Sequence, residues 1–222
     1  MLLAFDTSSA AVTVALADPV TGATVASSSA VDGLRHGELL APAIAEVLAG
    51  AGCSVRELTR IAVGVGPGPF TGLRVGLVTA RTMGEVLGIE VAGVCSLDVL
   101  ARQSSLQLPV AVATDARRKE IYWALYDGPA ADGSRRRLEG PAVDKPAEVA
   151  HVLAGLPVIG RGAVLYGEAL GLERVDVIEY PSAEVLALGV ATGTLPTVAP
   201  DPLYLRRPDV TMSGGPKSVL PK

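Results

Sequence analysis

The order of strand-like and helix-like segments constrains the fold of this 222-residue chain more than any other feature. Residues 2–6 and 11–17 (LLAFD and AVTVALA) are aliphatic and β-branched and are joined through the turn-forming DTSSA, which predicts a β-hairpin. Residues 110–115 and 121–127 (VAVATD and IYWALYD) flank ARRKE in the same way. Because each half of the chain opens with a hairpin, we predict two related units.

Helical segments follow both hairpins. Apolar side chains recur at helical spacing within residues 36–49, and Gly50 ends that pattern. The other predicted elements are strands at 23–31, 61–65 and 91–94 and helices at 70–87, from Ser96, near 146–154 and near 182–190. The segments LPVIG, GRGAVLYG and VDVIEY lie between the last two helices. This order predicts an α/β protein with one lobe at 1–105, a second at 106–208 and a disordered tail at 209–222.

Composition narrows the classes of protein. No segment approaches the roughly 18 apolar residues of a membrane span, and the N-terminus lacks a signal-peptide pattern. We therefore expect a cytoplasmic protein that does not bind a membrane. Two cysteines without a CxxC motif favour neither a disulfide framework nor a zinc knuckle. The net charge of −4 does not favour a cationic nucleic-acid binder, although Arg117, Arg118 and Lys119 form a basic run that could lie in a solvated loop or contact nucleic-acid phosphates.

The glycine-rich segment GVGPGPFTGLRVG at residues 64–76 is not a known phosphate loop. It does not match GxxxxGK followed by Ser or Thr, and the first 118 residues contain no lysine. Thr71 occupies the position of the last glycine that a GxGxxG fingerprint requires. The glycines instead predict a tight strand-to-helix turn and a helix that approaches its neighbours closely.

Small residues recur every four positions along the helix predicted at 70–87. Interior glycines each cost about 1 kcal/mol of helix propensity, so they require a compensating close contact. Two interpretations stay open: burial between a sheet and the helix at 36–49, or a subunit interface. The residues predicted for that interface are Leu39, Leu40, Ile44, Gly72, Leu73, Gly76, Leu77, Ala80 and Gly84.

Several of these segments together resemble one bacterial family. GVGPGPFTGLRVG, FDTSS, RHGELLAP, TDARRKEIYWALY and PLYLR look like the corresponding segments of the TsaB (YeaZ) family, over roughly residues 1–210. The resemblance implies two RNase H-like or actin-like lobes, each a mixed sheet flanked by helices. It also implies that the helices at 36–49 and 70–87 form homodimers or pair with TsaD.

The resemblance implies a role in making threonylcarbamoyladenosine, the modified base beside the anticodon of tRNAs that read codons beginning with A. In that pathway TsaD performs the transfer, TsaB is its non-catalytic partner, and the ATPase TsaE joins them, so contact with tRNA is indirect. TsaD-like proteins hold a metal through two histidines four residues apart, and Ser96 and Leu100 stand at those places here. His36 and His151 are far apart, and neither HExxH nor GxSxG occurs, so the sequence predicts neither a metal site nor a peptidase.

Nucleotide binding is the alternative hypothesis, as an active actin-like ATPase or small-molecule kinase. Asp6, Thr7 and Ser8 lie in the first hairpin turn and Asp115 lies in the second, where actin-like ATPases hold phosphate and magnesium. Ser8 replaces the usual glycine, however, and Asp6 could simply close an Asx turn. Residues 160–167 (GRGAVLYG) could be the remnant of an adenosine-side loop. We expect weak nucleotide affinity in the isolated chain, and ATP or ADP could bind within the complex.

Overall fold

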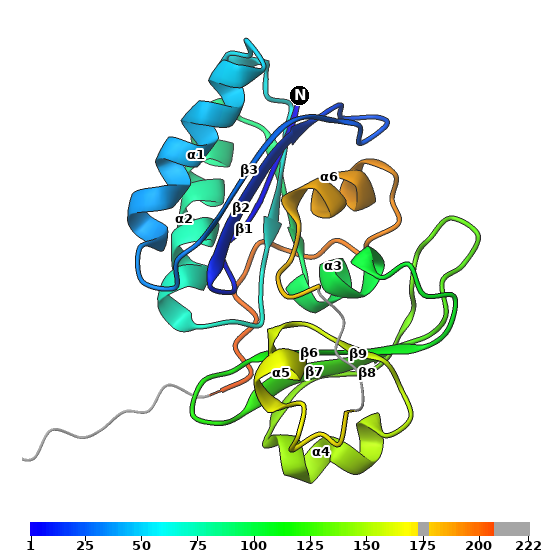
Figure 1. Ribbon diagram of the computed structural model, residues 1–222. Coiled ribbons are helices and arrows are strands. Elements are labelled where there is room, and N and C mark those ends of the chain that lie inside the picture. Colours follow the sequence, from blue (N-terminus) through cyan, green and yellow to red (C-terminus); the bar gives the residue numbers. More distant parts are fainter. Residues whose placement is uncertain (173–177, 207–222) are drawn as a thin grey trace, which may run out of the picture.

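The computed structural model describes residues 1–172 and 178–206 (Figure 1). Two sheets lie one above the other in this view, and helices cover both faces of each sheet. The first sheet has the order β3-β2-β1-β4-β5, and the second has the order β8-β7-β6-β9. The predicted α/β architecture with two mixed sheets is confirmed.

The first sheet combines a meander with two parallel strands. β1 (Leu2–Asp6) pairs antiparallel with β2 (Ala11–Ala17), and β2 pairs antiparallel with β3 (Thr24–Val31). On its other side β1 pairs parallel with β4 (Arg60–Gly64), which pairs parallel with β5 (Glu90–Val94). Every residue of β1 and β2 is buried, which explains their nearly continuous apolar sequence.

Alternate residues of β1 face different helices, because successive side chains of a strand point to opposite faces. Leu3 and Phe5 belong to the core beneath α1 (His36–Gly50) and α2 (Phe70–Leu87). Leu2 and Ala4 face α6 (Ala183–Ala191) on the other side. A short 3₁₀ helix at Val55–Glu57 precedes β4. No helix among the described residues is both long and apolar enough to cross a bilayer.

The second sheet is built around the second predicted hairpin, β6 (Val110–Asp115) and β7 (Ile121–Tyr126). β8 (Arg137–Asp144) pairs antiparallel with β7, and β9 (Val158–Ile159) pairs parallel with β6. α3 (Ser96–Gln103) covers the face toward the first sheet. α4 (Pro146–Leu153) and α5 (Arg161–Tyr166) cover the opposite face.

Three predictions about the second half require comment. β8 was not predicted from the sequence, and the segment GRGAVLYG contains the helix α5 rather than a loop. VDVIEY at 175–180 lies partly outside the described residues, and its last three residues form neither helix nor strand. The tail predicted at 209–222 lies outside the described residues altogether.

The last described segment runs back across the molecule. α6 packs on the first sheet, and Val198 forms an antiparallel bridge with Gly93 of β5. Leu203 then donates its backbone N–H to Val65, and Arg206 donates to the carbonyl of Ala116 in the second hairpin. The division predicted near residue 105 therefore separates the strands of the two sheets but not their helices, because α3 covers the second sheet and α6 covers the first.

Candidate functional site

The turn between β1 and β2 holds a buried carboxyl group whose acceptor positions are occupied. Asp6 is 1% exposed, and its Oδ1 accepts hydrogen bonds from the backbone N–H and the hydroxyl of Ser8, both at 2.7 Å. Its Oδ2 accepts from the Ser96 hydroxyl at 2.5 Å. Burial raises the pKa of Asp6, while the hydrogen bonds from Ser96 and Ser8 oppose that shift. Asp6 thus closes the predicted Asx turn, and its surroundings favour this structural role over magnesium binding.

Thr7 links the same turn to the glycine-rich helix. Its hydroxyl donates to the carbonyl of Gly72 at 2.8 Å and accepts from the backbone N–H of Gly76 at 3.1 Å. A Cβ atom at Gly72 would lie 2.7 Å from the Thr7 carbonyl oxygen, and one at Gly76 would overlap the Thr7 hydroxyl. A Cβ atom at Gly84 would likewise overlap the Val91 side chain of β5. The regular glycine spacing is therefore explained by close packing of α2 on its own sheet.

The residues predicted for a subunit interface mostly face the core of the chain itself. Leu39 is partly buried and packs against that core. The other eight are buried: Leu40, Ile44, Gly72, Leu73, Gly76, Leu77, Ala80 and Gly84. The helical periodicity of α1 and α2 therefore marks the face turned toward β1, β2 and β4. The alternative interpretation, burial against the sheet, accounts for these residues.

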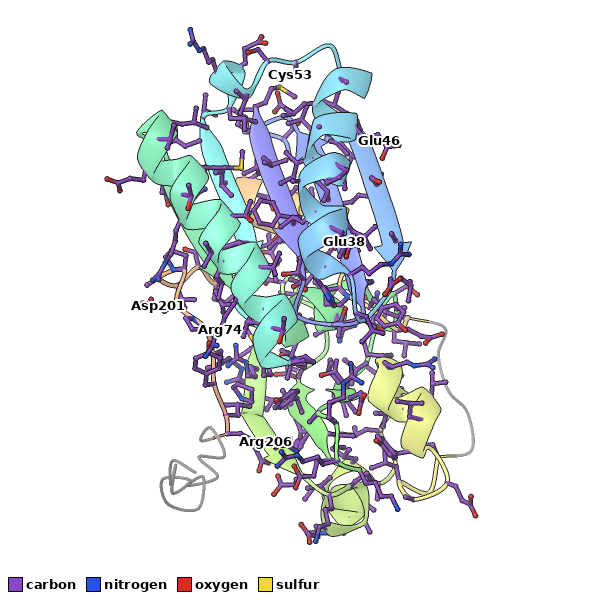
Figure 2. All side chains as sticks on the ribbon, turned by 90° about the vertical axis from the view of Figure 1, so that its left-hand side faces the viewer. Glu38, Glu46, Cys53, Arg74, Asp201 and Arg206 are labelled. Carbon is purple, nitrogen blue, oxygen red and sulfur yellow. The ribbon has the colours of Figure 1, made fainter. Side chains whose placement is uncertain are left out.

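The outer face of α1 and α2 mixes small and apolar side chains with charged ones, which are Glu38, Glu46, Arg74, Arg81 and Glu85. The two helices lie side by side on one face of the molecule (Figure 2). Exposed positions of α1 include Ala41, Pro42, Ala45 and Ala49. On α2, Val78 and Val86 are 61% and 78% exposed. Among the described side chains of the two helices, these valines are the large apolar ones that are exposed.

The turn between β6 and β7 also begins with an aspartate, but that aspartate accepts fewer hydrogen bonds than Asp6 does. Asp115 Oδ1 accepts the backbone N–H of Arg117 at 2.9 Å and the Tyr166 hydroxyl at 3.3 Å. Arg117, Arg118 and Lys119 all have positive φ, a conformation that is uncommon for residues other than glycine. The basic run predicted from the sequence is therefore a tight turn at the end of the hairpin, and all three of its residues are exposed.

A cavity of about 210 Å³ lies between the two turns. Ser8, Ser9 and Ala10 of the first turn line it together with Thr114, Asp115 and Arg117 of the second. Two of the four predicted nucleotide-site residues, Ser8 and Asp115, therefore line one cavity, whereas Asp6 and Thr7 are buried behind its wall. Arg161 and Leu165 of the segment GRGAVLYG also line this cavity, whereas sequence reasoning missed the wall residues Leu97, Glu179 and Tyr180.

The residues considered as metal ligands, or standing at such positions, make contacts within the chain: Ser96, Leu100 and His36 pack or hydrogen-bond there. Ser96 donates to Asp6, and Leu100 is fully buried in the core of the second sheet. His36 is 7% exposed, and its Nε2 lies 2.7 Å from the carbonyl oxygen of Ser9. His151 is exposed on α4. Within the described ranges, no three His, Cys, Asp or Glu side chains gather in a way that could hold a metal ion.

A buried polar cluster stabilises the second sheet, and no sequence motif marks it. Asp98 of α3 accepts two hydrogen bonds from Arg137, at 3.0 and 2.6 Å, and one from the Tyr126 hydroxyl at 2.6 Å. Burial, with the charge of Asp98 second, raises the pKa of the neighbouring Cys95 thiol to about 12. A thiol held protonated is a poor nucleophile, so this cluster is a packing element rather than a reactive centre.

Comparison with known proteins identifies the family. The model of the family described as "TsaD: tRNA N6-adenosine threonylcarbamoyltransferase" matches residues 31–210. The solved structure of YeaZ from Pseudomonas aeruginosa is 31% identical, with a TM-score of 0.75, and the match covers 92% of this chain and 99% of that one. This chain belongs to the TsaB (YeaZ) family. The predicted resemblance and the actin-like, two-lobed fold are thereby confirmed.

Curated relatives agree with this assignment. The Escherichia coli tRNA threonylcarbamoyladenosine biosynthesis protein TsaB is 31% identical over 153 residues, which cover 68% of this chain and 64% of that protein. A Mycobacterium leprae protein described as uncharacterized is 40% identical over 211 residues, or 94% of this chain. The match covers 55% of that relative, so this TsaB family member spans about half of its length.

Proposed function

We propose that this chain is the non-catalytic partner subunit of the TsaD-containing complex, which installs the threonylcarbamoyl group on the adenosine beside the anticodon. Membership of the TsaB family carries this proposal. The contacts of Ser96, Leu100 and Asp6 support it, because these side chains serve packing and turn formation at the positions where a relative would hold a metal or nucleotide.

The proposed contact with TsaD uses the outer face of α1 and α2. This keeps the two predicted helices and replaces the buried residues by the exposed ones, above all Ala45, Val78 and Val86. Small side chains on α1 allow another helix to approach closely, and the two valines supply apolar area next to them. Two copies of the free chain can pair through the same face, so homodimers compete with the TsaD complex.

The remaining parts of the assembly follow from this role. TsaE joins the pair as its ATPase, and contact with tRNA is made through the complex. Because its substrate is tRNA under modification, the complex works in the cytoplasm.

Reconstitution tests the proposal directly. TsaD, TsaE and the enzyme that makes the threonylcarbamoyl-AMP donor are incubated with tRNA, with and without this chain, and threonylcarbamoyladenosine is measured by mass spectrometry. We expect product only when this chain is present. An equal yield without it would remove the partner role.

Val78→Arg tests the proposed face. Because Val78 is 61% exposed, the free energy of unfolding of the variant should lie within about 0.5 kcal/mol of that of the original chain. A charge buried in an apolar contact should weaken binding to TsaD at least about tenfold. Val164→Arg on α5 is the matched control, because Val164 is 42% exposed but lies on the second lobe. If both variants bind TsaD equally well, another surface makes the contact.

A further inference from the structure

The strand at one edge of the first sheet lacks the residues that usually protect an exposed edge. β3 pairs with β2 on one side, and no described strand pairs with it on the other. Its eight residues, TVASSSAV, include neither a charged residue nor a proline, and six of them are exposed. An edge of this kind offers its free backbone groups to another extended chain.

The register of β3 shows which backbone groups face away from the sheet. Asp32, directly after β3, donates its backbone N–H to the carbonyl of Ala10 at 2.9 Å. Because hydrogen-bonded pairs alternate along an antiparallel ladder, every second residue counted back from Asp32 turns its N–H and C=O toward β2. The residues between them turn these groups toward the open edge, and they include Ser27, Ser29 and Val31.

Two carboxylates flank this edge on opposite faces of the sheet. The Ser27 hydroxyl donates to Oε1 of Glu184, on α6, at 2.6 Å. The Ser28 hydroxyl donates to Oε2 of Glu46, on α1, at 3.2 Å, and Glu46 is labelled in Figure 2. Both glutamates are exposed, and neither forms an ion pair with a described residue. This uncompensated negative charge favours a cationic partner.

A groove lies beside this edge on the α6 face of the sheet. Its volume is about 490 Å³, and Ser27, Ser29, Tyr180 and Glu184 are among the residues that line it. Alternate side chains of an added strand would point to this face, and the side chains between them would point to the face where Glu46 lies. The groove therefore gives room to one set of side chains of an added strand.

We propose that the open edge of β3 binds an extended segment of another protein, which joins the sheet as a further strand and carries two successive lysine or arginine residues. Successive residues of a strand point to opposite faces, so one cation meets Glu184 and the next meets Glu46. A second copy of β3 fits less well, because its glutamates would face those of the first copy. This site is additional to the proposed role as a partner of TsaD and does not depend on it.

A peptide titration on the full chain tests the edge. Two hexapeptides with blocked termini, Thr-Val-Lys-Lys-Val-Thr and Thr-Val-Glu-Glu-Val-Thr, are compared by isothermal titration and by amide hydrogen exchange. We expect the lysine peptide to bind at least about tenfold more tightly than the glutamate peptide. It should also slow amide exchange of Ser27, Ser29 and Val31 severalfold, because their N–H groups gain acceptors. Absence of binding, equal binding of the two peptides, or unchanged exchange at these residues would each overturn the proposal.

Substitutions at Ser29 test strand addition itself. Ser29→Pro removes an N–H that points to the open edge and not to β2, so the variant should stay folded and bind the lysine peptide at least about tenfold more weakly. Ser29→Ala is the matched control, because it keeps that N–H and should bind as the original chain does. Melting temperatures without peptide show that each variant is folded. Full binding by a folded Ser29→Pro chain would refute strand addition.

Substitutions of the two glutamates test the charge without changing the strand. Glu46→Gln and Glu184→Gln should each weaken the lysine peptide severalfold, and the double variant should weaken it further. Undiminished binding by the double variant would refute the cationic partner. Light scattering of the free chain tests the other occupant. A dimer that Ser29→Pro dissociates would show that a second copy takes this edge, and would overturn the proposal.

Discussion

The turns that close the two hairpins occupy the same place in their sheets but have opposite surroundings. Each begins with an aspartate whose Oδ1 accepts the backbone N–H two residues later, at 2.7 Å for Asp6 and 2.9 Å for Asp115. The first turn is packed beneath α2, and both carboxylate oxygens of its aspartate are used. Both turns line the cavity, but in the second turn one oxygen of the aspartate accepts nothing from the described residues.

This difference shows that the same turn motif can be purely structural in one place and accessible to a ligand in another. An Asx turn needs only a short acidic side chain and a turn, so its presence alone does not indicate a binding site. Packing decides which of the two carboxylates can meet a ligand. Asp6 is enclosed by Ser8, Ser96 and the backbone of Gly64, where a Cβ would overlap it, while Asp115 stays partly exposed.

The largest effect should come from breaking the packing of the first turn. Gly76→Leu places a side chain on the Thr7 hydroxyl, so we expect a loss of about 3 kcal/mol or more in the free energy of unfolding, or no folded protein. If the glycines of α2 formed a subunit interface instead, this variant would stay folded and lose only its partner. Gly37→Ala is the control, because a Cβ there meets no atom within 4 Å. Urea unfolding of both variants decides the matter, and a stable Gly76→Leu chain would contradict the packing.

The two aspartates themselves should differ by a smaller amount. Asp6→Ala leaves the Ser8 N–H and the Ser8 and Ser96 hydroxyls without their acceptor in a buried place, which should cost about 2–3 kcal/mol. Asp6→Asn retains one acceptor oxygen and should cost less. Asp115→Ala should cost about 1 kcal/mol or less, because its turn is partly exposed. Equal losses in the two alanine variants, measured by urea unfolding, would remove the distinction between the turns.

The pH dependence of stability sharpens the same contrast. Burial raises the pKa of Asp6 above its ordinary 3.8, so the folded chain holds this proton to a higher pH than the unfolded chain. The contribution of Asp6 is complete below about pH 3.8 and falls as pH rises toward the folded pKa. The free energy of unfolding of the original chain, minus that of Asp6→Asn, should therefore decrease between pH 4 and pH 7. An increase over this range would show that the folded pKa is lowered instead.

The sequence predicts local elements of this fold well because their signals are local. Both hairpins and the two long helices have the predicted bounds within one residue. β8 was missed because its sequence RLEGPAVD contains Gly140 and Pro141 and lacks strict alternation, and its pairing with β7 is irregular there. The position of α6 on the first sheet depends on contacts with β1 and β2, which no local pattern encodes.

The candidate site shows the same limit. Asp6 and Asp115 were found because they sit in hairpin turns of a recognisable kind. Thr114 was passed over because a threonine in an apolar strand is ordinary, and only its missing hydrogen bond distinguishes it. Arg161 and Glu179 come from different segments, so their ion pair in the cavity wall becomes visible only in three dimensions.

The smallest effect concerns how the second turn is held. Arg206 donates to the carbonyl of Ala116 at 2.8 Å and pairs with Glu120, and its place beside the second lobe is visible in Figure 2. Since this contact reaches the turn from the far end of the chain, Arg206→Met should cost about 1 kcal/mol and speed amide exchange of residues 116–120 severalfold. Exchange in the first turn, which α2 holds, should not change.

Arg136→Met is the control, because its ion pair with Asp127 is exposed and should contribute less than about 0.5 kcal/mol. If Arg206→Met leaves exchange in the second turn unchanged, the turn keeps its shape through its own backbone hydrogen bonds, between Ala116 and Glu120 and between Glu120 and Arg117.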